Sequence, residues 1–414
     1  MPPMEGLRGT GPSPRAGSIP ASRVPSYQLL AHSTQDGLAR RLVKMAQDGR
    51  IAMRFVYHET EWGKFADGTD NIKVGGFVDA EGRSRNQLRG QHVVFLASFH
   101  SNDVSMSQFH VFIMLLQSFI ESLTIVLPFY PCATMERVTV EGQVATANTM
   151  AQMFSHLPSC GRPTRVMVYD LHTLQNRFYL SNHAVANLQS AVPLMLDYLL
   201  PGRSAAVIDG TRASASDCNG ARGIVDESPP SAPAPAPAFS DSASASMLSF
   251  APEMPIDGIA FPDDGAAKRF KSMFEFDGRR DAWARAANAN GIKFEIIVCG
   301  KHRMGEERRV TVLDGDPRGK HLLIVDDLVQ TGGTLFECGK ALRDRGAASV
   351  SAFVVHSVFP NESWRRFAHG GDRSVFRRFF TTNTVPTVAD ALPKDDVFVV
   401  FDVAERLVED LQWG

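Results

Sequence analysis

The stretch His321–Leu342, HLLIVDDLVQTGGTLFECGKAL, decides the fold class. The four apolar residues Leu322 to Val325 have the length and composition of a buried strand, and two aspartates follow at its carboxyl end. Helix-like spacing resumes after the turn formed by residues 330–334. A buried strand that leads directly into a helix is typical of parallel α/β sheets, in which ligands bind at the carboxyl ends of the strands.

The turn between this strand and this helix predicts a phosphate site. Consecutive backbone N–H groups at a helix N-terminus converge on an anion, and the helix dipole favours negative charge there. Gly332 and Gly333 allow the backbone to approach a ligand closely, while Thr331 and Thr334 add hydroxyl donors for phosphate oxygens. We therefore expect a phosphate group to bind in this turn.

The two aspartates need a different ligand, because carboxylates repel phosphate. Vicinal sugar hydroxyls donate hydrogen bonds to carboxylates, so Asp326 and Asp327 predict the diol of a sugar phosphate. Two other interpretations stay open. An apolar strand followed by two aspartates also occurs in P-loop ATPases, although the chain has no GxxxxGK[ST] motif and GDPRGKH, from Gly315, has the wrong spacing. The aspartates could also be solvated residues before an ordinary capped helix.

The composition limits the class of partner. A chain of 414 residues has room for two or three domains. Its 43 basic and 45 acidic residues nearly balance, and no basic run could follow a phosphate backbone, so we expect no nucleic-acid partner. The 5 cysteines lack the CxxC spacing of metal sites and fit a reducing compartment.

The most apolar segment, Val111–Phe129, is interpreted as a buried helix followed by a strand. Polar residues interrupt the run VFIMLLQSFIESLTIVLPF, and Pro128 ends it, so a membrane span is not expected. The N-terminal residues lack the apolar core of a secretion signal. We expect a cytoplasmic location and no membrane partner, with import into an organelle left open.

Apolar strand-like runs alternate with helix-like segments through most of the chain, which predicts parallel sheets covered on both faces. Residues 202–255, which include PPSAPAPAPAF, are rich in Ala, Ser and Pro and cannot bury enough apolar surface to offset the entropy of ordering. We therefore expect a disordered tail at 1–26, an N-terminal domain at 27–201, a disordered insertion at 202–255 and a C-terminal domain at 256–414.

Several segments resemble one enzyme family. The turn is similar to the loop that binds phosphoribosyl diphosphate (PRPP) in type I phosphoribosyltransferases. WGKFADGTDN from Trp62, VYDLHTLQNRFYL from Val168, AFPDDGAAKRF from Ala260 and CGKHRMG from Cys299 resemble, in order, segments of ribose-phosphate diphosphokinase, or PRPP synthase, nearest its plant-type class II branch. The resemblance implies an α/β fold of two tandem type I phosphoribosyltransferase-like domains, each a mainly parallel sheet flanked by helices.

This resemblance implies a diphosphoryl transfer. The family transfers the β,γ-diphosphoryl group of MgATP to the 1-hydroxyl of ribose 5-phosphate, giving PRPP and AMP for nucleotide biosynthesis, so Mg²⁺ is the implied cofactor. Lys301 and Arg303 match the catalytic Lys-x-Arg, whose cations face the diphosphate; a solvated basic loop is the alternative. Asp263 and His172 match residues that bind Mg-ATP, although a histidine after an apolar strand is often a core residue.

The C-terminal resemblance covers the sugar phosphate. Asp326 and Asp327 match the positions that hold the ribose hydroxyls. The loop that binds the 5-phosphate is matched by Gln330, Thr331, Gly332, Gly333 and Thr334. Gln330 stands where many relatives have an aspartate, which removes one negative charge beside the phosphate. Asp170 and Asp264 could be helpers or ordinary loop residues.

The N-terminal resemblance is looser. Phe65 and Asp67 match an element that contacts adenine, often across a subunit boundary, so a homo-oligomer is expected. In the segment CATMER, residues 132–137, an uncharged pair replaces the Arg and Gln that hold ATP in the larger class of the family. Glu136 and Arg137 remain as ATP-binding candidates or as a surface ion pair. Either ATP is held differently, or the range of nucleotides is broader, or ATP binding is lost.

Three functions are therefore compared. An active PRPP synthase with ATP and ribose 5-phosphate as substrates is the main hypothesis. A noncatalytic subunit that assembles with an active synthase is the second, and a phosphoribosyltransferase that consumes PRPP is the third. The intact Lys-x-Arg and sugar-phosphate loop favour the first over the second, and the N-terminal resemblance favours it over the third.

Overall fold

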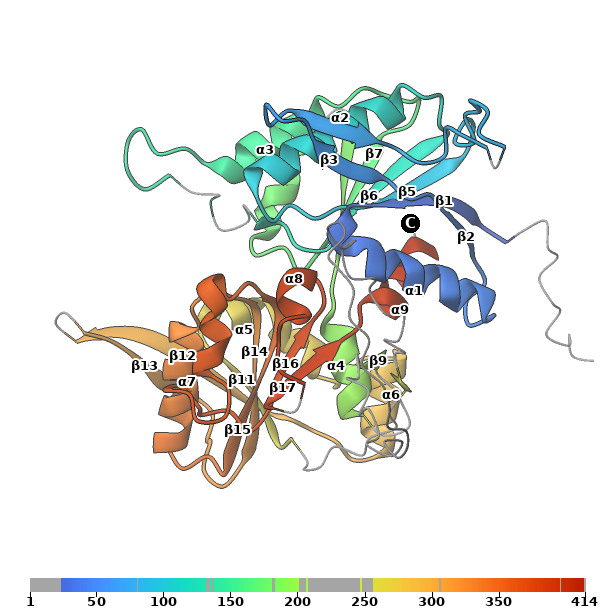
Figure 1. Ribbon diagram of the computed structural model, residues 1–414. Helices are drawn as coiled ribbons and strands as arrows, with labels where there is room; N and C mark the ends of the chain where they lie inside the picture. Colours follow the sequence, from blue (N-terminus) through green and yellow to red (C-terminus); the bar gives the residue numbers. More distant parts are fainter. Residues whose placement is uncertain are drawn as a thin grey trace, which may run out of the picture.

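Each half of the chain forms a mainly parallel sheet covered by helices (Figure 1). The computed structural model describes residues 24–79, 81–131, 135, 138–180, 183–200, 206–207, 246–247, 256–304, 307–394 and 396–412. For residues 206–207, 246–247, 301–304 and 307–309 it describes the backbone alone.

The N-terminal sheet has six parallel strands, in the spatial order β2 (Arg54–Tyr57), β1 (Ser26–Ala31), β5 (His92–Leu96), β6 (Ser122–Leu127), β7 (Thr164–Tyr169) and β8 (Ala184–Gln189). Because successive side chains of a strand point to opposite faces, Leu29 and Leu30 of β1 enter two different cores. Helix α1 (Asp36–Gln47) contributes to the first core, and α2 (Asn102–Leu116) and α3 (Thr146–Ser155) to the second. Both faces of this sheet are therefore covered, as the apolar strands predict.

The segment predicted as a helix followed by a strand is confirmed. Helix α2 ends at Leu116, and β6 begins at Ser122. The helix begins earlier than the apolar run, at Asn102, because the Ser101 Oγ accepts a hydrogen bond from the Val104 N–H, 3.2 Å away. In the described part of the chain, no helix combines the length and the apolar character needed to cross a bilayer.

The C-terminal sheet has nine strands, in the order β10 (Ser246–Met247), β9 (Ala206–Val207), β17 (Phe398–Phe401), β16 (Phe379–Thr382), β15 (Ser349–Ser357), β14 (His321–Val329), β11 (Gly258–Phe261), β12 (Glu295–Met304) and β13 (Glu307–Asp314). The strands from β17 to β12 are parallel, while both edges of the sheet are antiparallel. Helices α5 (Asp264–Phe274) and α6 (Ala282–Ala289) share one core with this sheet, and α7 (Gly333–Asp344) shares the other.

Strands β9 and β10 lie inside the segment predicted as an insertion, 202–255, and pair with each other beside β17. The rest of that segment lies outside the described residues, as does most of the tail predicted at 1–26. The domain limits at 201 and 256 stay a prediction.

The two halves exchange helices. Helix α4 (Val192–Leu199) follows the N-terminal sheet in sequence but packs on the C-terminal one, where the Tyr198 ring centroid lies 5.1 Å from that of Phe380. Helix α9 (Ala404–Gln412), near the other end of the chain, lies beside α1 (Figure 1). Its Asp410 Oδ2 accepts a hydrogen bond of 2.9 Å from the Tyr169 hydroxyl of β7. One apolar cluster consequently runs through both halves.

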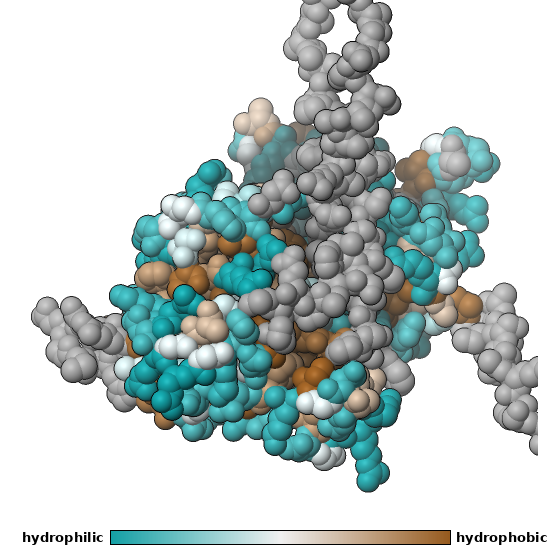
Figure 2. Space-filling view, turned by 90° about the horizontal axis from the view of Figure 1, so that it is seen from below, coloured by the Kyte–Doolittle hydropathy of each residue, from teal (hydrophilic) through white to brown (hydrophobic). Residues whose placement is uncertain are grey.

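The end of the molecule formed by the C-terminal half is mainly hydrophilic at its surface, and apolar residues appear there as small patches (Figure 2). The large apolar side chains of this half lie inside the two cores instead, as Phe353 and Phe379 do with no exposed surface. Burial of such side chains is the main favourable contribution to folding.

The carboxyl group of Asp410 makes the contact between the halves sensitive to pH. Asp410 is 2% exposed, and its burial raises the pKa of the carboxyl group to about 6. The charge of Arg406 opposes this shift. A pKa raised in the folded state adds stability that is fully present below the unfolded value, near 3.8, and is lost as the pH rises through about 6.

We predict that Asp410→Asn removes this pH dependence, because an amide does not titrate. The free energy of unfolding of the variant minus that of the wild type should increase as the pH rises from about 4 to about 7 and then level off. Urea denaturation at a series of pH values measures both proteins. A difference that stays constant over this range would contradict the assignment.

Candidate active site

A cleft of about 1020 Å³ lies at the carboxyl ends of the central strands. It is lined by the segments that follow β7 and β11, by the end of β14 and by the first residues of α5 and α7. Most of the predicted site residues meet here, from both halves of the chain: His172, Asp263, Asp326, Asp327, Gln330, Thr331, Gly332, Gly333 and Thr334.

The predicted phosphate turn follows β14, but the strand is longer than predicted. It continues beyond Val325 through both aspartates to Val329, because β15 still pairs with it at Leu328 and Val329. Helix α7 begins at Gly333, and among the described residues no side chain caps its first N–H groups. The uncapped N–H groups of this turn can therefore bind an anion.

Gly332 gives the turn its shape. It has φ +71°, in the left-handed region, and a Cβ built on it would lie 2.3 Å from an atom of the Phe367 ring. Only glycine avoids both the backbone strain and this clash.

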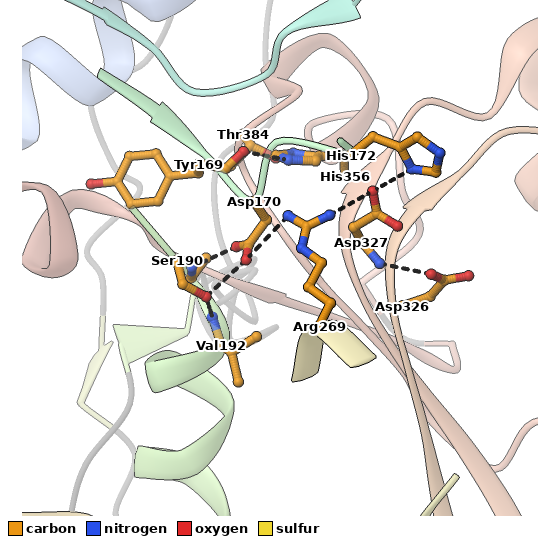
Figure 3. A network of polar contacts seen from close by, with 11 residues as sticks. Tyr169, Asp170, His172, Ser190, Val192, Arg269, Asp326, Asp327, His356 and Thr384 are labelled. Atoms are coloured by element: carbon orange, nitrogen blue, oxygen red, sulfur yellow. Dashed lines mark hydrogen bonds and ion pairs between the residues drawn. The ribbon is translucent and has the colours of Figure 1, made fainter. Parts of the chain in front are cut away.

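Asp327 is the ionised member of the aspartate pair. Its Oδ2 accepts hydrogen bonds from His172 Nδ1, 2.8 Å away, and from Arg269 Nη1, 3.2 Å away (Figure 3). Burial opposes ionisation, but His172 and Arg269 together hold the pKa of Asp327 well below its usual range. For Asp326, burial and the charge of Asp327 raise the pKa well above its usual range. The pair thus supplies one charged acceptor and one carboxyl group that keeps its proton more readily.

Arg269 is a site residue that sequence reasoning missed. It extends from α5 with 13% of its side chain exposed, and its Nη2 lies 3.8 Å from Asp170 Oδ1 at the end of β7. Together with the bond to Asp327, this contact joins the two halves of the chain across the cleft (Figure 3). Arg269 belongs to the family-like segment AFPDDGAAKRF. An arginine in a helix, however, carries no local sequence signal that distinguishes it from a surface residue.

Asp170 and His356 support this junction. Asp170 has φ +36° and accepts hydrogen bonds from Ser190 Oγ at 2.8 Å and from the Ala191 N–H at 2.7 Å. His356 Nε2, from β15, donates to the carbonyl of Tyr169 at 3.0 Å. Asp170 is therefore a buried structural group rather than a solvated loop residue, and burial raises its pKa.

Asp263 lines the same cleft as the aspartate pair. It caps α5 by accepting a hydrogen bond from the Ala266 N–H at 3.1 Å, and its charge contributes, after burial and Asp327, to the raised pKa of Asp326. Over the part of the chain that the structure describes, no three His, Cys, Asp or Glu side chains converge closely enough to hold a metal by themselves. A small number of carboxylate ligands fits Mg²⁺, which keeps water and substrate phosphates in its coordination sphere.

Other predicted residues do not meet at the cleft. Phe65 and Asp67 lie at the tip of the hairpin of β3 (Glu61–Lys64) and β4 (Asp70–Lys73), where the Asp67 Oδ1 accepts the Thr69 N–H at 2.9 Å. Neither lines the cleft, and Phe65 is 56% exposed.

The remaining candidates are only partly described. Glu136 and Arg137 lie outside the described residues. The backbone of Lys301 and Arg303 belongs to β12, which pairs with β13 in an antiparallel arm, and their side chains are not described.

Comparison with known proteins supports the fold and the family. A family model for the phosphoribosyl transferase domain matches residues 288–372, which include the turn. The crystal structure of phosphoribosylpyrophosphate synthetase from Mycobacterium smegmatis has the same fold, with a TM-score of 0.59 over 94% of this chain and 98% of that one at 20% identity. The chain therefore has tandem phosphoribosyltransferase-like domains, as predicted.

Plant relatives give the family. Ribose-phosphate pyrophosphokinase 4 from rice is 36% identical over 85% of this chain and 86% of its own length. The Arabidopsis thaliana protein of the same name is 35% identical over 91% of this chain and 88% of its own. The spinach protein named ribose-phosphate pyrophosphokinase 3, mitochondrial, is 34% identical over 91% of this chain and 74% of its own. The chain belongs to the ribose-phosphate pyrophosphokinase family, and the resemblance to its plant-type branch is confirmed.

We predict that Gly332→Ala lowers the free energy of unfolding by about 1–3 kcal/mol, because it combines a strained φ with the overlap on Phe367. The matched control is Gly319→Ala, since Gly319 has φ +68° and nothing within 4 Å of the added Cβ. Urea denaturation should show the larger loss for Gly332→Ala. Equal losses would mean that the Phe367 ring moves aside without cost.

Proposed function

We propose that this chain is an active PRPP synthase that transfers the β,γ-diphosphoryl group of MgATP to the 1-hydroxyl of ribose 5-phosphate, giving PRPP and AMP for nucleotide biosynthesis. One observation carries the proposal: the aspartate pair and the anion-binding turn open into one cleft, from one continuous strand–turn–helix unit. A sugar phosphate has the diol and the phosphate that these two groups require.

In this proposal, ribose 5-phosphate binds with its phosphate at the turn of residues 330–334 and its hydroxyl groups at Asp326 and Asp327. The charged Asp327 accepts a hydrogen bond from the diol. Asp326 lines the cleft, and its carboxyl group accepts the Asp327 N–H at 2.9 Å, which constrains its orientation. Diphosphoryl transfer requires mainly positioning and charge neutralisation, which such a constrained site supplies.

Lys301 and Arg303 are proposed to neutralise the transferred diphosphate. The register of the sheet supports their position, because Phe261 of β11 pairs with Val298 of β12. Lys301 comes three residues after Val298, and Asp263 comes two residues after Phe261. Both residues therefore lie at the same edge of the sheet. The two cations would thus come from the strand next to the metal-binding aspartate.

Asp263 and His172 are proposed to hold Mg²⁺ with ATP. His172 Nδ1 is bonded to Asp327, so coordination by this ring would use Nε2. When bound, the ion neutralises phosphate charge as it develops. Asp263 supplies a hard oxygen ligand beside the aspartate pair.

The remaining ATP contacts are proposed to come partly from a second copy of the chain. Phe65 and Asp67 lie on an exposed hairpin away from the cleft of their own chain, which supports a homo-oligomer in which they contact adenine in a neighbouring subunit. Glu136 and Arg137 stay ATP-binding candidates. Because an uncharged pair replaces Arg and Gln in CATMER, the range of nucleotide donors has to be measured.

A cytoplasmic location stays a prediction, and the names of a chloroplastic relative from rice and a mitochondrial relative from spinach make an organelle the alternative. We propose no nucleic-acid or membrane partner. The relatives are named as pyrophosphokinases, which favours catalysis over a noncatalytic subunit or a PRPP-consuming transferase.

The test of this function is phosphorus NMR of the purified protein with MgATP and ribose 5-phosphate. We expect AMP and PRPP to appear in equal amounts. Lys301→Ala should lower turnover by roughly 10² to 10³ with little change in affinity for ribose 5-phosphate. Lys340→Ala, on the exposed face of α7, is the control. If the wild type forms neither product while it binds ribose 5-phosphate, the noncatalytic alternative holds.

We also predict that Asp327→Asn weakens the binding of ribose 5-phosphate roughly 10- to 100-fold, because a charged acceptor at the diol is lost. Titration calorimetry measures the affinity. Asp264→Asn is a matched control, since the Asp264 side chain is 68% exposed and pairs with Lys268. Unchanged affinity in Asp327→Asn would show that the diol binds elsewhere.

A further inference from the structure

An arginine, Arg373, lies beside the phosphate turn of residues 330–334. Arg373 lies in the loop before β16, and its Nη1 donates a hydrogen bond of 3.0 Å to the carbonyl of Thr331. The same Nη1 lies 3.9 Å from a Cβ built on Gly333. The guanidinium carbon lies 5.5 Å from the centroid of the Phe336 ring, in the first turn of α7. Three contacts therefore place this positive charge at the N-terminus of that helix.

Arg373 and the N-terminus of α7 place two sources of positive potential side by side. The N-terminus of a helix carries partial positive charge and normally attracts acidic side chains. The first turn of α7 has no acidic residue, and no side chain of the described residues caps it. A cation here adds to the positive potential instead of balancing it, so an anion placed between the guanidinium and the uncapped N–H groups would be attracted by both.

The neighbouring carboxylate does not supply that anion. Asp372 contributes to the field around Arg373, but its oxygens are bonded to Arg366, with 3.0 Å between Arg366 Nε and Asp372 Oδ1. Within the described residues, the structure contains no ion pair of Arg373. One N–H of its guanidinium is used by Thr331, and an arginine has five such donors.

We propose that Arg373 binds the 5-phosphate of the sugar phosphate together with the N–H groups of the turn, and so selects phosphorylated sugars. This inference rests on the proposed function, because it concerns the same ligand. The carbonyl of Thr331 and the ring of Phe336 hold the guanidinium at the rim of the turn before the ligand arrives. A planar guanidinium then donates two parallel hydrogen bonds to phosphate oxygens.

Titration calorimetry of the full chain with ribose 5-phosphate, and separately with MgATP, tests the inference. Arg373→Gln should weaken ribose 5-phosphate roughly 10- to 100-fold and leave MgATP unchanged. Arg373→Lys should recover part of the loss, because it keeps the charge without the planar fork. The control is Arg377→Gln. Arg377 is exposed in the same loop, and its backbone N–H donates to the carbonyl of Val350, near the N-terminal end of β15 and so at the end of that strand away from the cleft.

The outcomes separate this inference from the proposed function. If the wild type forms AMP and PRPP but Arg373→Gln binds ribose 5-phosphate as the wild type does, the role of Arg373 is wrong and the function stands. If Arg373→Gln weakens both ligands equally, the residue only maintains the fold, which also overturns the inference. If the affinity for ribose 5-phosphate falls selectively but the wild type has no turnover, Arg373 binds phosphate in a noncatalytic protein. If the wild type binds no ribose 5-phosphate, both proposals fail.

Discussion

The arrangement of the cleft depends on the largely buried guanidinium of Arg269. This side chain comes from a helix of the C-terminal half and faces a carboxylate from each half, Asp170 and Asp327. A buried carboxylate without a partner has a large desolvation penalty, and removal of one member of a buried ion pair leaves that penalty uncompensated. The carboxyl ends of β7 and β14 are consequently held on either side of one cation, and the orientation of Asp327 in the cleft follows from the same contact.

Further features of the structure restrict the same junction. His356 donates to the carbonyl of Tyr169, and burial lowers the pKa of His356 to about 4, so the ring makes this bond in its neutral form at neutral pH. The next residue, Asp170, has a positive φ, a conformation that a residue other than glycine keeps only when its surroundings determine it. The exchange of α4 and α9 between the halves adds apolar burial around these polar contacts. The two sides of the cleft are thus parts of one packed unit.

The sequence was sufficient for the features that depend on neighbouring residues. Hydrophobic periodicity predicted the parallel strands, and the spacing of glycine and threonine predicted the turn before α7. The predicted end of β14 was wrong. The strand extends to Val329 because it pairs with β15, and a local sequence pattern holds no information about this pairing. Arg269 was missed for the same reason: the carboxylates that give it a role are 99 residues earlier and 58 residues later in the chain. The helix exchange likewise depends on contacts between distant segments.

The charges around the proposed sugar-phosphate site differ between its two ends. Burial, and after it the charges of Asp327 and Asp263, raise the pKa of Asp326, and these carboxyl groups gather at one end of the cleft. At the other end, the N-terminus of α7 and Arg373 present positive charge. A phosphate alone would interact only with the positive end. A diol with a divalent cation would interact only with the carboxyl groups. Because the aspartate pair and the turn belong to one strand–turn–helix unit, a ligand that joins a diol to a phosphate can reach both.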